Sequence, residues 1–175
     1  MLIYLIGYMG SGKTTISRML ARRMRMEFAD MDAEIVGAAG KSVGEIFAEK
    51  GEEEFRRLEN KALAKVAKCE NAVIATGGGT PCFFDNMEVM NATGLTIYLK
   101  MSPEKLATRL ERSKNKRPLI MNKDQKELVG FIAENLEKRE PFYSKAKLII
   151  DGDRASDQYI AEHIGIYLDN YEKGR

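Results

Sequence analysis

Short runs of hydrophobic residues alternate along this chain with longer stretches in which hydrophobic positions recur every three or four residues. Continuous runs of four to eight residues are typical of strands buried on both faces of a parallel sheet. Three runs have this character: Leu2–Ile6, Ala72–Thr76 and Leu95–Leu99. They predict buried strands, and the shorter run Leu148–Ile150 predicts a further strand.

The stretches between the runs have the periodicity of amphipathic helices. Helices are predicted at Lys13–Met26, Val43–Ala48, Glu52–Lys68, Ser102–Arg112, Leu128–Arg139 and Tyr159–Tyr171. Ser102 suits a helix N-cap with Pro103 at the first helical position, and Pro141 is expected to end the preceding helix. Strands separated by helices indicate βαβ units. We therefore expect one α/β domain over residues 1–175, a three-layer α/β/α fold with a central parallel sheet.

The amino-acid composition excludes several classes of function. Lys and Arg number 28 against 26 Asp and Glu, a net charge of +2, whereas a general nucleic-acid binder would have a clear basic excess. The two cysteines are too few for a disulfide framework and suit a reducing compartment. No targeting or membrane-spanning pattern is visible. We therefore expect a cytoplasmic protein that binds neither nucleic acid nor membranes. Its single histidine, His163, leaves little room for histidine-based chemistry.

The strongest motif is Gly-Tyr-Met-Gly-Ser-Gly-Lys-Thr at residues 7–14, which matches G-x-x-x-x-G-K-[ST] between a predicted strand and helix. The glycines let backbone N–H groups point at phosphate oxygens, and the helix start adds partial positive charge. Lys13 supplies charge to the outer phosphates, and the Thr14 hydroxyl is placed to bind Mg²⁺. We predict a nucleoside-triphosphate site formed by Gly10, Ser11, Gly12, Lys13, Thr14 and Thr15.

Two classes of nucleotide-binding protein fit poorly. A regulatory GTPase would need D-x-x-G and N-K-x-D motifs, and the sequence has neither. Leu148–Asp151 resembles the acidic strand end of an ATPase motor, but it lies very late in the chain. We interpret it as the last strand followed by a turn at Asp151 and Gly152.

Two further motifs indicate a small-molecule acceptor. Asp30 and Asp32 lie in a segment that we take to be extended, so their carboxylates would share one face beside the phosphate loop. One could bind Mg²⁺ through water while the other contacts an acceptor hydroxyl; a turn with a helix N-cap is the alternative. After the second strand, Gly77–Gly79 would let a ligand approach the backbone closely.

Together these residues resemble the shikimate kinases over nearly the whole chain. The matching positions are the phosphate loop, Asp30, Asp32, Gly51, Glu54–Glu59, Thr76–Gly79, Lys116–Leu119, Lys138, Arg139, Pro141 and Tyr143. The resemblance implies a P-loop nucleoside-triphosphate kinase fold with a mobile lid. It also implies phosphorylation of the 3-hydroxyl of shikimate by ATP with one Mg²⁺, giving shikimate 3-phosphate and ADP, in the chorismate pathway to aromatic amino acids. We expect a monomer.

The resemblance also implies residue roles. Asp32 would hold the acceptor hydroxyls and help remove the proton, and Asp30 would lie near Mg²⁺. Arg56 and Arg139 would bind the shikimate carboxylate, and Gly77, Gly78 and Gly79 would line the acceptor pocket. Arg117 would close over the transferring phosphate from a lid at residues 111–123. These assignments place Lys13, Asp32 and Arg117 in catalysis.

Some alternatives stay open at this stage. Arg109 matches the arginine that stacks on adenine, but Arg112 is close enough in sequence to compete. The acceptor could instead be gluconate or a nucleoside monophosphate, although a nucleotide acceptor would not need two arginines for a carboxylate. A nucleotide-binding regulatory protein without turnover is the alternative from a different class.

Overall fold

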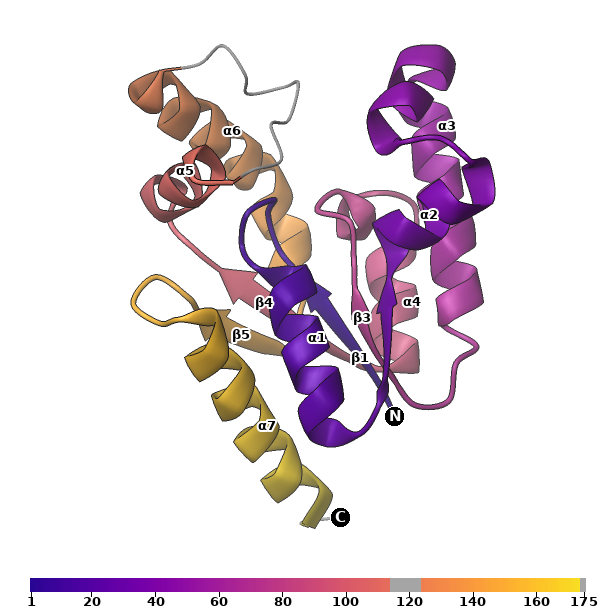
Figure 1. Ribbon diagram of the computed structural model, residues 1–175, viewed down its shortest axis with the longest axis vertical. Coiled ribbons are helices and arrows are strands. Elements are labelled where there is room, and N and C mark those ends of the chain that lie inside the picture. Colours follow the sequence, from indigo (N-terminus) through magenta and orange to yellow (C-terminus); the bar gives the residue numbers. More distant parts are fainter. Residues whose placement is uncertain (114–123, 174–175) are drawn as a thin grey trace.

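Five parallel strands form the sheet at the centre of the molecule (Figure 1). The computed structural model describes residues 1–113 and 124–173. The strands are β1 (Leu2–Ile6), β2 (Glu27–Asp30), β3 (Ala72–Ala75), β4 (Leu95–Lys100) and β5 (Leu148–Asp151), in the order β2-β3-β1-β4-β5. The predicted α/β class with a parallel sheet is confirmed.

Helices cover both faces of the sheet, as Figure 1 shows. They are α1 (Lys13–Met24), α2 (Met31–Ala39), α3 (Val43–Val66), α4 (Asn86–Thr93), α5 (Pro103–Glu111), α6 (Gln125–Tyr143) and α7 (Asp157–Lys173), with a short 3₁₀ turn η1 (Thr80–Cys82). Helices α1 and α7 pack side by side on one face. Residues of α3 and α4 pack against the other. The three layers expected from the sequence are therefore present.

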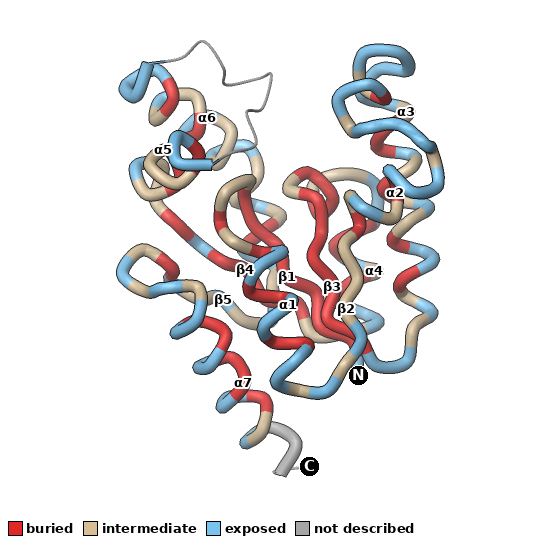
Figure 2. The backbone as a smooth tube through the Cα atoms, in the orientation of Figure 1, coloured by how far each residue is buried: buried red, intermediate tan, exposed pale blue. Residues whose placement is uncertain are grey.

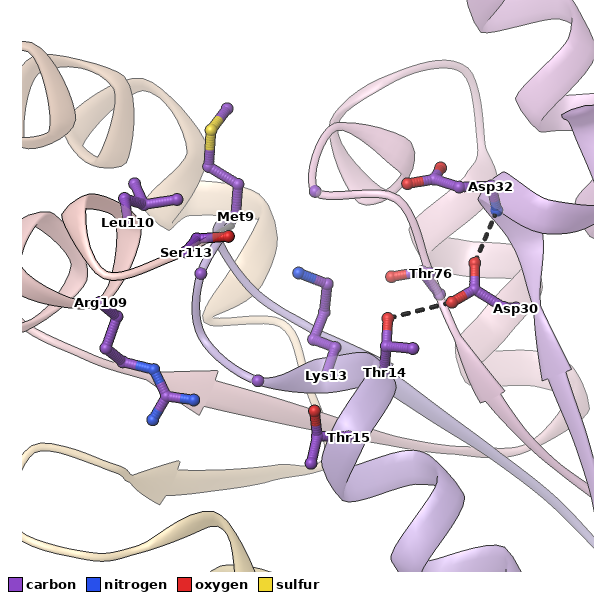
Figure 3. A pocket seen from close by; sticks show the side chains of 13 residues that line it. Met9, Lys13, Thr14, Thr15, Asp30, Asp32, Thr76, Arg109, Leu110 and Ser113 are labelled. Atoms are coloured by element: carbon purple, nitrogen blue, oxygen red, sulfur yellow. Dashed lines mark hydrogen bonds between the residues drawn. The ribbon is translucent and has the colours of Figure 1, made fainter. Parts of the chain in front are cut away.

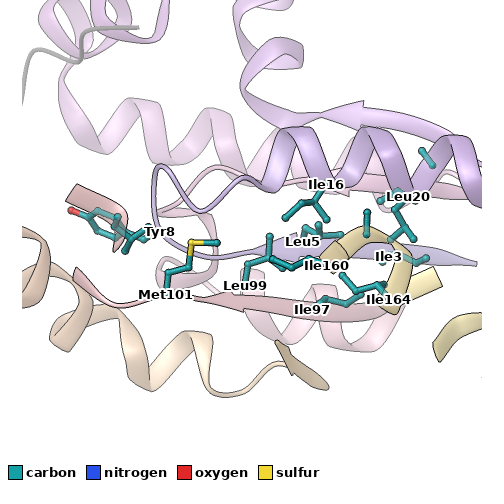
Figure 4. Packing of buried hydrophobic residues seen from close by; sticks show 14 of the residues in the cluster. Ile3, Leu5, Tyr8, Ile16, Leu20, Ile97, Leu99, Met101, Ile160 and Ile164 are labelled. Atoms are coloured by element: carbon teal, nitrogen blue, oxygen red, sulfur yellow. The ribbon is translucent and has the colours of Figure 1, made fainter. Parts of the chain in front are cut away.

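The central strand β1 divides the core in two because successive side chains of a strand point to opposite faces. Ile3 and Leu5 pack with α1 and α7 (Figure 4), whereas Leu2, Tyr4 and Ile6 pack with α3 and α4. All five side chains are buried, and β1, β3 and β4 form the buried centre in Figure 2, whereas β2 and β5 at the sheet edges are partly exposed. This explains why the run is continuously hydrophobic: both faces are covered.

The two helices expected at residues 43–68 are present as the two parts of α3, which meet at a kink at Gly51, whose φ of 77° is not helical. Other elements differ from the prediction. Helix α4 was not predicted. Helix α6 runs through Pro141 to Tyr143, so the prediction that it ends before the proline is wrong. The Ser144 N–H still donates to the Glu140 carbonyl at 2.9 Å, so the helical bonding continues past the missing proline donor.

The chain bends directly after the last strand, in line with the interpretation of Leu148–Asp151 as a strand end. Asp151 is the last residue of β5, and its carboxylate accepts from the Asp153 N–H at 2.9 Å. Of the predicted lid, residues 114–123 lie outside the described residues, and Arg117 is among them. In the part of the chain that the structure describes, no helix is long and apolar enough to cross a membrane.

Candidate active site

The phosphate loop joins the carboxyl end of β1 to the first residue of α1. Gly12 precedes the helix with a φ of 90°, a left-handed conformation that favours glycine. The carbonyl of Tyr8 accepts from the Ser11 N–H at 3.2 Å and from Lys13 Nζ at 2.9 Å. The buried Lys13 side chain is thus folded over its own loop, with its ammonium at the loop's centre (Figure 3).

Asp30 connects this loop to the neighbouring strand. It is the last residue of β2 and the N-cap of α2, and its Oδ1 accepts from the N–H groups of Asp32 and Ala33 at 3.1 and 3.2 Å. Its Oδ2 accepts from Thr14 Oγ1 at 3.0 Å (Figure 3). One carboxylate oxygen therefore holds the helix start, and the other faces the phosphate loop. The helix-cap alternative and the site-residue hypothesis are both compatible with this geometry.

Asp32 reaches the same cavity by a different route from the one predicted. The segment is not extended as far as Asp32, because β2 ends at Asp30 and Asp32 is the second residue of α2. The argument from alternate strand side chains is therefore wrong. A sharp strand-to-helix turn places both carboxylates on the cavity wall instead. Figure 3 shows the Asp32 side chain pointing toward the loop that follows β3.

That loop, Gly77–Gly79, is contacted by four charged side chains. A Cβ at Gly77 would collide with Glu59 Oε1 and would lie 3.0 Å from Asp32 Oδ1. At Gly79 a Cβ would collide with the Arg56 guanidinium, and at Gly78 it would lie 3.4 Å from Arg139 Nη1. Glycine is needed at residues 77 and 79, because charged groups occupy the space that a side chain would take there.

Arg56 is buried against this loop and held by acidic and aromatic neighbours. Its Nη1 donates to Glu59 at 2.7 Å, and its Nε and Nη2 donate to Glu52 at 3.2 and 2.8 Å. The guanidinium lies 4.2 Å from the centroid of the Phe83 ring. Bonded along its edges and packed on one face, the side chain has little freedom to rotate.

Glu59 is a residue to which the sequence analysis assigned no role. It is 1% exposed, and it accepts from Arg56 Nη1 and from the buried Thr80 hydroxyl, each at 2.7 Å. Burial raises the pKa of Glu59 against the opposing hydrogen bonds from Thr80 and Arg56. The sequence signal was its spacing, since a carboxylate three residues after Arg56 on one helix lies within reach of it.

Helix α6 brings Arg139 to the glycine loop, Gly77–Gly79, next to Gly78. The Arg139 guanidinium lies 5.1 Å from the centroid of the Tyr8 ring in the phosphate loop. Four residues later, the buried Tyr143 hydroxyl donates to the Gly78 carbonyl at 2.6 Å. Residues separated by one helical turn share a face. Tyr143 therefore ties the helix that carries Arg139 to the loop beside it.

A cavity of about 340 Å³ opens between these elements. The predicted site residues on its wall are Gly10, Gly12, Lys13, Thr14, Thr15, Asp30, Asp32, Gly78 and Arg109. Gly77 and Gly79 belong to the glycine loop and Arg56 and Arg139 adjoin it, but none of these four residues lines the cavity. Ser11 is buried in the phosphate loop. Between the two arginines considered for adenine, Arg109 lines the cavity, whereas Arg112 follows the end of α5 and is exposed.

Comparison with known proteins identifies the family. The shikimate kinase family model matches residues 9–168. The chain belongs to the shikimate kinase family. A shikimate kinase of Parabacteroides distasonis is 52% identical over 152 residues, which cover 87% of this chain and 88% of that protein.

Solved shikimate kinases share the same architecture. The crystal structure of shikimate kinase from Bacteroides thetaiotaomicron superposes with a TM-score of 0.90 at 44% identity, covering 96% of this chain and 98% of that one. A shikimate kinase from Acinetobacter baumannii, solved in complex with shikimate, gives a TM-score of 0.86 at 33% identity over 97% and 93% of the two chains. The P-loop kinase fold expected for a shikimate kinase is thus confirmed.

Proposed function

We propose that this protein transfers the γ-phosphoryl group of ATP to the 3-hydroxyl of shikimate, giving shikimate 3-phosphate and ADP. The observation that carries the proposal is the position of the glycine loop. Gly77–Gly79 adjoin Asp32, Arg56 and Arg139, and a Cβ at Gly78 would also lie 3.4 Å from the Gly7 carbonyl oxygen in the phosphate loop. The family supports the same reaction, since an Acinetobacter baumannii member was solved with shikimate.

The donor half of the site is built from the phosphate loop. Backbone N–H groups of Gly10, Ser11 and Gly12 together with Lys13 would hold the β- and γ-phosphates, and Thr15 lines the same cavity. Lys13 Nζ already lies over the loop, bonded to the Tyr8 carbonyl at 2.9 Å. Phosphate oxygens would offer this ammonium stronger, charge-assisted bonds.

The residues beside Lys13 suit Mg²⁺. Thr14 Oγ1 and Asp30 Oδ2 lie 3.0 Å apart at the cavity wall. Mg²⁺ prefers oxygen ligands and usually keeps several waters while it binds substrate phosphates through few protein groups. Thr14 would bind the ion directly and Asp30 through water. When bound, Mg²⁺ would neutralise charge on the β- and γ-phosphates.

The acceptor half of the site supplies two arginines that would bind the shikimate carboxylate and an aspartate that would act as a base. Arg56 and Arg139 would bind the shikimate carboxylate, because a fixed guanidinium matches a carboxylate in two parallel hydrogen bonds. Asp32 would hold the acceptor hydroxyls and accept the proton of the attacking one. Catalysis of phosphoryl transfer depends mainly on positioning the reactants and neutralising the charge of the phosphates. Lys13 and Arg117 would neutralise that charge.

The reaction is tested by ADP release coupled to NADH oxidation, with shikimate, gluconate, AMP and CMP supplied separately at millimolar concentration. We expect release in step with added shikimate only. Asp32→Asn should lower turnover by about 100-fold or more, the usual contribution of a positioned base, whereas Glu34→Gln, on the same helix, should not. Stimulation by gluconate or AMP instead of shikimate would contradict the proposal, as would full activity of Asp32→Asn.

A further inference from the structure

An ion pair borders the cavity on the side away from the acceptor residues. Arg109 Nη1 and Nη2 donate to the two carboxylate oxygens of Asp157, each at 2.8 Å. The side chains are 26% and 20% exposed, so the pair is largely shielded from water. Figure 3 shows Arg109 on one side of Lys13, and Asp30 and Asp32 on the other.

This arrangement fixes which end of a nucleotide meets Arg109. A triphosphate in the loop must direct its terminal phosphate toward the acceptor, hence toward Asp32. Its base then lies on the opposite side of Lys13, where Arg109 lines the cavity. The base end of the site is therefore the end at which the ion pair stands.

The ion pair controls the orientation of the guanidinium. Two parallel N–H···O bonds hold a carboxylate and a guanidinium in one plane. Asp157 thus uses the outer edge of Arg109 and leaves its flat faces for stacking, which is how arginine binds aromatic rings. A lysine at residue 109 would retain the charge but would present no plane.

Both partners are held by well-packed helices. Arg109 lies in α5 beside the buried Leu106 and Leu110. Asp157 is the first residue of α7, and Ser156 performs the capping, because its hydroxyl accepts from the Tyr159 N–H at 3.2 Å. The Asp157 carboxylate is therefore available to the arginine.

The pair also touches the phosphate loop. A Cβ at Gly12 would lie 2.8 Å from Arg109 Nη2 and 3.0 Å from both Asp157 carboxylate oxygens. Gly12 lies directly before Lys13, so the distance between the arginine plane and the phosphate-binding groups is short and set by rigid backbone. Base and phosphates of one ligand could contact both at once.

We propose that Asp157 is a positioning residue for the nucleotide: it holds the Arg109 guanidinium edge-on so that its face stacks on the purine base. The inference rests on the proposed function, because it requires an adenine nucleotide in the phosphate loop. It predicts an effect on ligands that carry a base and none on the phosphates alone.

The test is isothermal titration of the full-length protein with ADP and, separately, with inorganic pyrophosphate, both with Mg²⁺. Asp157→Asn should weaken ADP binding about tenfold, the loss expected for one stacked cation, and leave pyrophosphate affinity within about twofold. Arg109→Lys should show the same selective loss. In an Arg109→Ala background, Asp157→Asn should add no further loss, since Asp157 acts through that arginine.

Asp169→Asn is the matched control. Asp169 also lies on α7 and pairs with an arginine, Arg23, at 2.8 Å, but far from the cavity. It should change neither affinity. Equal weakening of ADP and pyrophosphate by Asp157→Asn would overturn the proposal, as would unchanged ADP binding in a variant whose melting curve shows it folded. If the wild-type protein bound ADP but did not phosphorylate shikimate, only the proposed acceptor would be contradicted, and the role of Asp157 would still be tested by ADP binding.

Discussion

Replacing Glu59 with alanine should strongly destabilise the protein. The Glu59 carboxylate is 1% exposed and bonds both Arg56 Nη1 and the Thr80 hydroxyl at 2.7 Å. Its removal leaves a guanidinium that is 10% exposed with one remaining carboxylate, Glu52, which is itself 59% exposed. It also leaves the buried Thr80 hydroxyl without its acceptor.

The size of the effect follows from these contacts. Removing one partner of a buried ion pair costs about 3–5 kcal/mol, because the other charge stays buried. A typical domain has about 5–15 kcal/mol of total stability, so Glu59→Ala would lose a large part of it. Glu59→Gln replaces one of the two acceptor oxygens by an NH₂ group: its remaining oxygen can accept from Arg56 while the NH₂ donates to the Thr80 hydroxyl. It should therefore lose about 1–3 kcal/mol, the usual value of a hydrogen bond to a charged group.

The assay is urea denaturation followed by circular dichroism at pH 7, together with acceptor kinetics for the variants that fold. Glu53→Ala is the control, because Glu53 pairs with Arg57 on the same helix at 2.7 Å but is 82% exposed. It should change stability by less than about 0.5 kcal/mol. If Glu59→Ala lost no more than Glu53→Ala, the reasoning that Arg56 depends on a buried counter-charge would be refuted.

Three further predictions concern the same region. Burial raises the pKa of Glu59 above its usual 4.5, so the folded protein binds that proton more tightly than the unfolded chain. The free energy of unfolding of the wild type, relative to Glu59→Gln, should therefore fall as pH rises from about 4.5 through the raised pKa. An increase of this difference with pH in urea titrations would contradict the prediction. Gly79→Ala should raise KM for shikimate about tenfold or more with little change in KM for ATP, because the new methyl would lie 2.7 Å from Arg56 Cζ; Gly37→Ala, where nothing lies within 4 Å, should leave the steady-state kinetics unchanged. Burial raises the pKa of the Cys82 thiol to about 11, so iodoacetamide labelling of the Cys82 peptide, followed by mass spectrometry at pH 7.5, should be at least about tenfold slower than that of glutathione, and labelling at the same rate would show that the thiol is accessible and ionised.

Much of the fold could be predicted because hydrophobic patterning is local. The run Leu2–Ile6 is buried on both faces, and its sequence shows it. Helix α4 escaped prediction because it has only eight residues, too few for a periodicity to be distinct. Pro141 led to the wrong prediction that α6 ends before it, because a proline within the last turn removes one hydrogen-bond donor without ending the helix.

The parts of the candidate site that lie within one short motif could be predicted from the sequence. The contacts between residues that are distant in sequence could not. The phosphate loop needs only its glycines, Lys13 and Thr14, all within eight residues. Tyr143 and Gly78 are 65 residues apart, and nothing in either sequence neighbourhood specifies their hydrogen bond. Asp32 was assigned to the site through the wrong local structure, because a helix begins at Met31 where an extended segment was expected.

The strand order has an evolutionary consequence. Strand β1 is central, with β3 and β2 on one side and β4 and β5 on the other. The residues proposed for the acceptor come from segments that follow β2 and β3, with Asp32 on α2 and Arg56 on α3, whereas Arg109 and Asp157 come from helices that follow β4 and β5. Helix α6 crosses between the halves and delivers Arg139. Substitutions after β2 and β3 that spare Asp30 are therefore expected to alter acceptor choice while nucleotide binding is inherited unchanged, so the two halves of the enzyme can diverge at different rates.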